Sequence, residues 1–207
     1  MSRLADLSLN AFLDALSSPD PTPGGGTASA MAGAIGASLL MMVSALPKSR
    51  TNVDSEQIAL RETGAALAAV KDGFVALADT DADAYKQVLA AYRLPKSSEG
   101  EQTARKDSVQ RALRAATEAP IETLRAASAA MKHARVVAEH ANRNAVSDVR
   151  VALELLEASA AGAAANVEIN LPGLDDEALK QSMAADVLAL SNQLKEDAAS
   201  ARAALTA

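Results

Sequence analysis

Cysteine and aromatic residues are what this sequence has least of. With no cysteine among its 207 residues, the chain can form no disulfide, no zinc–thiolate site and no cysteine nucleophile. Tryptophan is absent and aromatic residues make up only 2% of the chain, although 49% of it is hydrophobic. The two histidines, His133 and His140, are too few for a histidine-rich metal centre.

Positive charge is also scarce. Twenty Lys and Arg face 26 Asp and Glu, which gives a net charge of −6, and no basic stripe stands out. This excludes the usual electrostatic footprint of a nucleic-acid partner. The first residues lack the basic-then-apolar order of a signal peptide, and a chain without cysteine suits a reducing cytosol, so we expect a cytoplasmic protein.

One uncharged stretch, residues 28–46, is almost long enough to cross a bilayer. It consists largely of Ala, Gly and Ser, and it lacks an aromatic belt and a flanking basic cluster. A helix that is buried on all sides has the same pattern. We therefore interpret the stretch as a core helix and predict no membrane contact.

What the sequence has in abundance is alanine, the best helix former. Proline- and glycine-rich breaks at 17–26, 94–95 and 171–173 separate segments with helical periodicity, and none alternates like a strand. We predict an all-α fold: a single domain over residues 1–207, a bundle of long antiparallel helices able to dimerise through helix faces. Pro120 should kink one helix or divide it. The expected helix caps are Ser8, Thr27, Asp54 with Gln57, Ser98 with Glu101, Ser147, and Asp175 or Asp176.

Asp81 interrupts an apolar row. Leu60, Leu67 and Phe74 recur at sevenfold spacing, and Val88 resumes the row after Asp81. Burying a lone carboxylate is costly unless it is paired or used. A catalytic carboxylate, a buried ion pair and a register-setting polar residue all fit the pattern. Tyr85, one turn later, is a possible hydrogen-bond partner, whereas Asp79 and Asp83 fall on positions that we expect to face solvent.

The Pro23-Gly24-Gly25-Gly26 segment precedes a predicted helix. Free N–H groups at a helix start favour anions, although a plain flexible connection has the same composition. It is not a P-loop, because no Gly-Lys-Ser/Thr follows it and no strand precedes it.

Two further polar groups lie near expected helix ends. One group lies at a helix start and consists of Asn144, Ser147 and Asp148. Helix capping alone would explain Ser147, and the helix dipole alone would explain Asp148. Asn166 and Asn170 are one turn apart and share a face. Their amides suit the edge of a heterocycle, but Asn also commonly ends helices.

These pieces occur in an order that resembles the cyclodeaminase/cyclohydrolase family of folate enzymes. The opening block is residues 21–27 followed by Gly33–Ala37 and Met42-Val43. The second block is residues 81–85 followed by Leu94-Pro95-Lys96, and the third and fourth are residues 144–148 and 166–170. The match spans nearly the whole chain. Two departures are Ala141, where the family usually has Gly, and Pro47–Arg50, which replaces a Thr-containing stretch.

The resemblance implies an all-α homodimer without a metal or cofactor, acting on a tetrahydrofolate derivative. It implies hydrolysis of 5,10-methenyltetrahydrofolate to 10-formyltetrahydrofolate or, alternatively, ammonia release from formiminotetrahydrofolate. A non-catalytic helical dimer that binds folate or a protein is the alternative from another class. We expect Asp81, Asp148 and Lys96 to be catalytic, with Asp81 as base and Lys96 as acid or as a binder of the glutamate tail. The expected substrate-binding residues are Pro23, Gly24, Gly25, Gly26, Asn144, Ser147, Asn166 and Asn170.

Overall fold

The computed structural model describes residues 3–46, 53–140 and 142–206, which form helices and connecting turns without a strand. Ala141 and Pro47–Arg50, the two departures from the family pattern, lie outside the described residues. The elements in order are η1 (Leu4–Asp6), α1 (Leu9–Ser17), α2 (Gly25–Ala45), α3 (Asp54–Tyr92), α4 (Glu99–His140), η2 (Arg143–Ala145), α5 (Val146–Asn170), η3 (Leu171–Gly173) and α6 (Glu177–Thr206).

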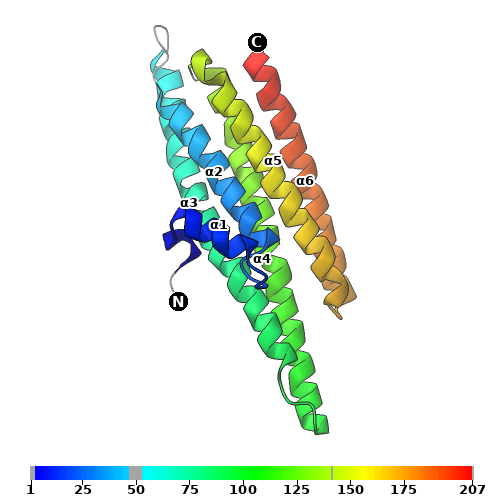
Figure 1. Ribbon diagram of the computed structural model, residues 1–207. Helices are drawn as coiled ribbons and strands as arrows, with labels where there is room; N and C mark the ends of the chain where they lie inside the picture. Colours follow the sequence, from blue (N-terminus) through cyan, green and yellow to red (C-terminus); the bar gives the residue numbers. More distant parts are fainter. Residues whose placement is uncertain (1–2, 47–52, 141, 207) are drawn as a thin grey trace.

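Helices α2 to α6 run alternately up and down and form the antiparallel bundle that the sequence predicts (Figure 1). Helix α4 packs against α2, α3, α5 and α6, while α2 lies between α3 and α5. The short α1 crosses the outside of the bundle, and the lower ends of α3 and α4 extend beyond the other helices as a hairpin (Figure 1). Helix α4 is continuous over 42 residues, so Pro120 does not divide it.

The heptad row of α3 forms part of the main core, as predicted. Leu67 and Phe74 are fully buried and Leu60 is 4% exposed. They pack with side chains of the neighbouring helices, among them Leu40, Leu124, Met131, Leu153 and Leu156. In α1, Phe12 is buried, whereas Leu9 and Leu13 are 71% and 52% exposed.

Gly33 allows α2 to approach α3 closely. A Cβ atom at this position would overlap the ring of Phe74, which is itself fully buried. We expect Gly33→Ala to destabilise the protein by about 1–3 kcal/mol, because the ring cannot move without disturbing the core. Thermal unfolding measures the effect. Gly73→Ala in α3, where nothing lies within 4 Å of the new methyl group, is the control, and an unchanged midpoint for Gly33→Ala would contradict this packing.

The predicted caps are confirmed at three helix starts. Ser8 Oγ accepts from the Ala11 N–H (3.2 Å), and Asp176 Oδ1 accepts from the Leu179 N–H (3.0 Å). Ser98 and Glu101 form the expected reciprocal box, with N–O distances of 3.1 and 3.2 Å.

The other three predicted caps are wrong, because the helices begin at different residues. Asp54 is the first residue of α3, where its charge suits the helix dipole, and Val53 is the N-cap. Ala145 and Gly24 are the N-caps of α5 and α2, which places Ser147 and Thr27 inside their helices. Thr27 is therefore free to make tertiary contacts.

Helix α2 is long and apolar enough to cross a membrane by length and composition, and half of its most apolar window is buried in the bundle. It packs against both α3 and α5. Its Gly36 lies close to α5, where a Cβ would be 3.1 Å from the Ala152 carbonyl oxygen. The sides of α2 that face α3 and α5 pack as a core helix does, in agreement with our interpretation of the uncharged stretch. The helix is not buried on all sides, however, because Ile35 and Met42 are 51% and 42% exposed.

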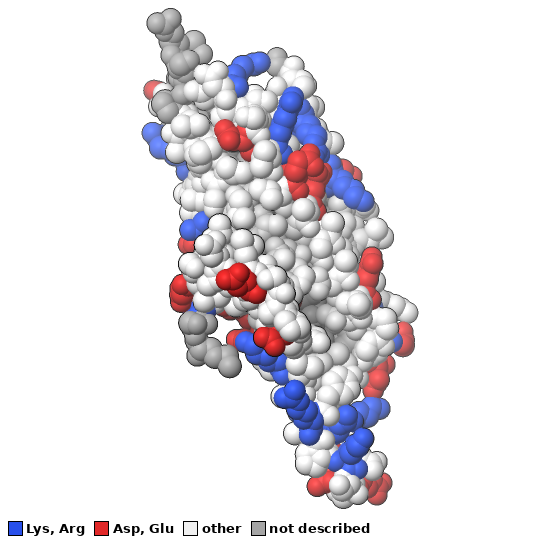
Figure 2. All heavy atoms as spheres, in the orientation of Figure 1, with Lys and Arg blue, Asp and Glu red and all other residues white. Residues whose placement is uncertain are grey.

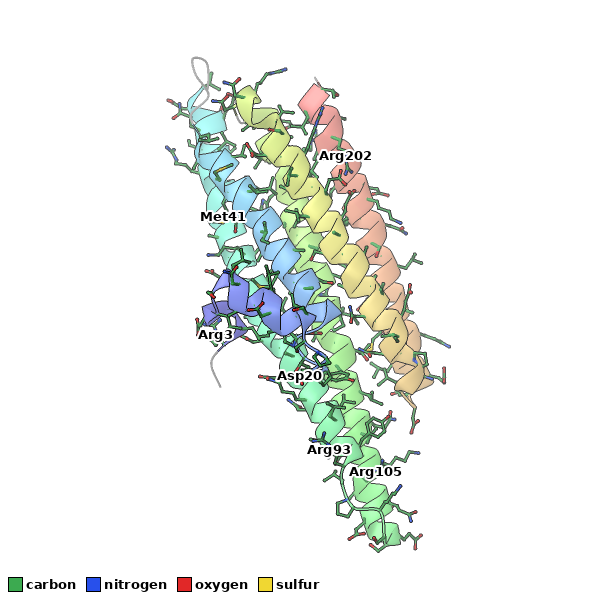
Figure 3. The ribbon with its side chains drawn as sticks, viewed as in Figure 1. Arg3, Asp20, Met41, Arg93, Arg105 and Arg202 are labelled. Carbon is green, nitrogen blue, oxygen red and sulfur yellow. The ribbon has the colours of Figure 1, made fainter. Side chains whose placement is uncertain are left out.

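Charged groups tie the outer elements to the bundle. Asp79, which we expected to face solvent, instead accepts from the Leu4 N–H at 2.7 Å and from Arg3 at 3.3 Å, and so holds the N-terminal segment on α3. In α6, Arg202, which is labelled in Figure 3, donates to both carboxylate oxygens of Glu157, at 2.7 and 2.6 Å, and to Glu154.

Candidate active site

The side chain of Asp81 extends from the middle of α3 to the first turn of α2. The Thr27 hydroxyl lies 3.1 Å from Asp81 Oδ2 and 3.3 Å from the Ala78 carbonyl oxygen. Thr27 is fully buried, whereas Asp81 is half-buried. The N-cap of α2, Gly24, has no side chain that can accept from the N–H groups of this turn. The Asp81 carboxylate lies beside these groups, where the helix dipole favours negative charge.

Glycine at position 26 is what makes this approach possible. A Cβ atom on Gly26 would overlap the Asp81 carboxyl group, with all three carboxyl atoms too close. We expected the glycines to admit a ligand to the backbone. At Gly26 the space left by the missing side chain is instead filled by the carboxylate of this same chain.

Asn166, near the end of α5, completes the group. A Cβ on Gly25 would lie 3.6 Å from Asn166 Nδ2, and this nitrogen donates to the Gly162 carbonyl oxygen at 2.7 Å. Helix α5 comes this close to α2 because Gly162 faces Ser29, whose hydroxyl occupies the space of a Cβ. The site thus combines the start of α2, the middle of α3 and the last turns of α5.

The electrostatics of Asp81 favour a carboxylate that readily takes up a proton. Burial raises the pKa of the Asp81 carboxyl group, and the hydroxyl and backbone N–H of Thr27 lower it by less. Within the described residues, no Lys, Arg or His forms an ion pair with Asp81, and Tyr85, 42% exposed, makes no hydrogen bond to it. A buried ion pair therefore does not explain this position.

The raised pKa gives a pH dependence for a reaction that needs the carboxylate form. As pH falls, Asp81 becomes protonated at a higher pH than an ordinary aspartate, so kcat/KM should decline along an acid limb displaced upward. The pH profile of kcat/KM for the free enzyme measures it. An acid limb at the pH of an exposed aspartate would contradict the effect of burial.

Several predicted site residues lie far from Asp81 in the same chain. The start of α5, at the opposite end from Asn166, is where Asn144, Ser147 and Asp148 lie. At 1.5 Å per residue, Asp148 is about 27 Å from Asn166 along the helix axis. Lys96 is exposed in the loop after α3. The part of α3 that follows Asp81, up to Tyr92, is about 16 Å long at 1.5 Å per residue, so Lys96 lies beyond that distance along the helix. One chain therefore brings together Gly25, Gly26, Asp81 and Asn166, but not these four.

Asn170 and Pro23 are also accounted for by the fold. The Asn170 Nδ2 atom donates to the Ala116 carbonyl oxygen of α4 at 2.9 Å, so its amide is engaged with the bundle. Pro23 is buried directly before α2, and the Thr22–Pro23 peptide bond is cis. Among the residues with described positions, no three His, Asp or Glu side chains gather as metal ligands, and metal-free chemistry stays a prediction.

Sequence reasoning missed Thr27, Ser29 and Gly162 as parts of this site. Thr27 follows the glycines directly, which suggested a cap, and nothing in the periodicity shows that its hydroxyl meets α3. Gly162 interrupts the Ala-rich run of α5, and this interruption was the available signal for a close helix contact.

The fold and the site define a class of protein: an all-helical bundle with a carboxylate beside a glycine-rich helix start, and this carboxylate has no cationic partner among the described residues. The family model for formiminotransferase-cyclodeaminase matches residues 8–189. A methenyltetrahydrofolate cyclohydrolase of Methylorubrum extorquens is 38% identical over 176 residues, covering 84% of this chain and 83% of that protein.

Two further relatives carry the other activity in their names. A formimidoyltransferase-cyclodeaminase of Rattus norvegicus is 31% identical over 196 residues, which are 95% of this chain but 36% of that protein. The crystal structure of a formiminotetrahydrofolate cyclodeaminase from Thermotoga maritima superimposes with a TM-score of 0.86 at 27% identity, covering 97% of this chain and 96% of that one. The chain belongs to the formiminotransferase-cyclodeaminase family.

Proposed function

We propose that this protein is a one-carbon folate enzyme that hydrolyses 5,10-methenyltetrahydrofolate to 10-formyltetrahydrofolate. The observation that carries the proposal is the Asp81 carboxylate, held half-buried against α2 without a cationic partner among the described residues. The methenyl substrate is a cation, and a preorganised carboxylate in a partly desolvated site stabilises such a charge. The 38% identity to a methenyltetrahydrofolate cyclohydrolase supports the same activity.

The proposed reaction needs one base and one acid in turn. Asp81 removes a proton from water as its oxygen bonds to the methenyl carbon of the substrate. The ring C–N bond then breaks as the protonated Asp81 returns its proton to the departing nitrogen. The hydroxyl on the same carbon loses its proton to solvent and becomes the formyl oxygen, so one proton is released for each cationic substrate hydrolysed. The raised pKa of Asp81 suits both steps, because it favours proton uptake and keeps the acid form accessible.

The binding roles are divided among the three helices. Gly25 and Gly26 let polar side chains approach the start of α2. Asn166 uses Nδ2 within its own helix, so its Oδ1 is the atom that we assign to the pterin edge. Thr27 fixes the orientation of the Asp81 carboxyl group through the 3.1 Å contact at Oδ2.

The alternative activity is ammonia release from formiminotetrahydrofolate, supported by the similarity to the cyclodeaminases of Rattus norvegicus and Thermotoga maritima. Both reactions pass through a tetrahedral centre at the same carbon, so the same base serves either. Parallel assays of methenyltetrahydrofolate absorbance and of ammonia release separate them. Turnover in the first assay alone supports the proposal, ammonia release alone supports the alternative, and folded protein inactive in both supports a non-catalytic dimer.

We further propose that the protein is a cytoplasmic homodimer. Helix α2 contains no charged residue, and Ile35, Met42 and Val151 are 51%, 42% and 51% exposed on α2 and α5. Figure 2 shows few charged atoms across the middle of the face that these helices form. If Asp148 and Asp81 act on one substrate, their separation within a chain also requires two copies.

The assembly has a direct test in sedimentation. We expect a species of about twice the 21.2 kDa chain mass, and Ile35→Asp should shift it toward the monomer because it places a charge on the apolar face. A wild-type protein that sediments as a monomer would contradict the dimer, without bearing on the chemistry of Asp81.

A further inference from the structure

Pro120 leaves a gap in the hydrogen bonding of α4. A proline inside a helix has no N–H to donate to the carbonyl four residues earlier, and its ring pushes that carbonyl aside. Here the carbonyl belongs to Ala116, which is buried, as is Pro120. Helix α4 nevertheless runs unbroken from Glu99 to His140. A buried carbonyl of this kind needs another donor.

The missing donor comes from the last residue of α5. Asn170 Nδ2 donates to the Ala116 oxygen at 2.9 Å, a good length for a hydrogen bond between amides. The side-chain amide of α5 thus replaces the backbone N–H that Pro120 lacks. The proline and the asparagine, 50 positions apart in the sequence, form one contact.

This contact fixes the part of α5 that reaches the site. Asn166 lies one turn before Asn170, and Val167 between them is fully buried in a cluster that contains Ala116 and Ile121. The Asn166 amide lies 3.6 Å from the position of a Cβ on Gly25. A shift or rotation of the last turn of α5 would therefore change the distance between Asn166 and the Gly25–Gly26 turn that holds Asp81.

We propose that Asn170 is a positioning residue: by bonding to the carbonyl that Pro120 leaves free, it sets Asn166 in the register that the site requires. The effect that we expect on KM rests on the proposed folate activity. The effect on the position of Asn166 does not depend on that activity. Asn170 itself touches no reacting atom, because its amide is turned to α4.

A double-mutant cycle with Pro120→Ala tests the contact, because alanine restores the backbone N–H to the Ala116 carbonyl. We expect Asn170→Ala to raise the KM for methenyltetrahydrofolate about tenfold, the ratio that about 1.4 kcal/mol produces, while kcat changes by less than about twofold. In the Pro120→Ala background the same substitution should change KM by less than about twofold. Asn170→Asp, isosteric but without the donor, should be at least as damaging as alanine.

A spectroscopic measurement keeps the test independent of activity. In NMR spectra, Asn170→Ala should shift the Asn166 side-chain amide and the Gly25 and Gly26 N–H resonances, and Pro120→Ala should largely suppress these shifts. Asn192→Ala, at an exposed position of α6, is the matched control and should shift none of them.

The outcomes separate the two proposals. A fall in the unfolding temperature of Asn170→Ala with KM and the Asn166 resonance both unchanged would overturn the positioning role and leave a purely structural one. Equal effects in both Pro120 backgrounds would overturn the replacement of the missing N–H. An inactive wild type would refute the folate activity alone, and the resonance shifts would then decide the positioning role.

Discussion

Replacing Asp81 by Asn is expected to reduce kcat for methenyltetrahydrofolate by about 10²–10⁴-fold, the usual contribution of a general base. The amide has the shape of the carboxyl group and can still accept the hydrogen bond from Thr27, so the fold should persist. It can neither take a proton from water nor pair with the cationic ring. Stopped-flow or conventional absorbance measurements of turnover, with circular dichroism for the fold, are sufficient.

Stability should move in the opposite direction from activity. Because burial raises the pKa of Asp81 in the folded protein, this group stabilises the fold at low pH, and that contribution is lost as pH rises through the folded pKa. At neutral pH the charged form carries a burial cost that asparagine removes. We therefore expect the unfolding temperature of Asp81→Asn at pH 7 to equal or exceed that of the wild type.

Asp83→Asn provides the matched control. Asp83 is two residues further on the same helix, but its side chain is 63% exposed and pairs with Lys86 at 2.8 Å. Its replacement should leave turnover unchanged, since an exposed pair contributes little. Equal rates for wild type and Asp81→Asn would refute the assignment of Asp81 as base. Equal losses for both Asp variants would show that the effect is not specific to the site.

Gly26→Ala is expected to reduce kcat/KM about as much as Asp81→Asn, although it changes no polar group. The new methyl group would occupy the space of the Asp81 carboxyl group, which must then leave Thr27. A displacement of this size removes the base from its productive geometry. The gain of about 1 kcal/mol in helix propensity from Gly to Ala does not restore the position. Turnover and thermal unfolding of the purified variant measure both effects.

Gly73→Ala isolates the effect of the methyl group itself. Gly73 lies inside α3, and nothing is within 4 Å of the position of its Cβ. We expect it to stabilise the protein by about 0.5–1 kcal/mol through helix propensity, with unchanged kcat/KM. Full activity in Gly26→Ala would mean that the carboxylate position in the structure is not the working one.

The helical fold and the place of Asp81 on the core-facing row of α3 follow from local pattern. The sevenfold row of Leu60, Leu67 and Phe74 fixes the buried face of α3, and Asp81 falls on that row whatever α3 packs against. Gly33 and Gly36, two glycines in an apolar helix, likewise indicate that neighbouring helices approach it closely. These features need only the period of one helix.

The partners of these residues could not be predicted in the same way, because periodicity does not say which helices meet. That Gly26 faces Asp81, and that Gly25 faces Asn166, depends on the order in which α2, α3 and α5 pack. Asn170 has a side-chain amide of the kind that binds ligands. Its amide instead donates to the Ala116 carbonyl oxygen, because Pro120 in the adjacent helix provides no N–H for that carbonyl. Proximity of motifs in a family pattern also does not give proximity in one chain, as Asp148 and Lys96 show.

The most direct test of the proposed activity is the loss of methenyltetrahydrofolate absorbance in the presence of the purified wild-type protein. The proposal predicts a decay that is faster than the spontaneous one in buffer. The excess rate should be proportional to enzyme concentration and should fall by about 10²–10⁴-fold with Asp81→Asn at the same concentration. A rate equal to that of buffer alone, with protein shown to be folded, would contradict it.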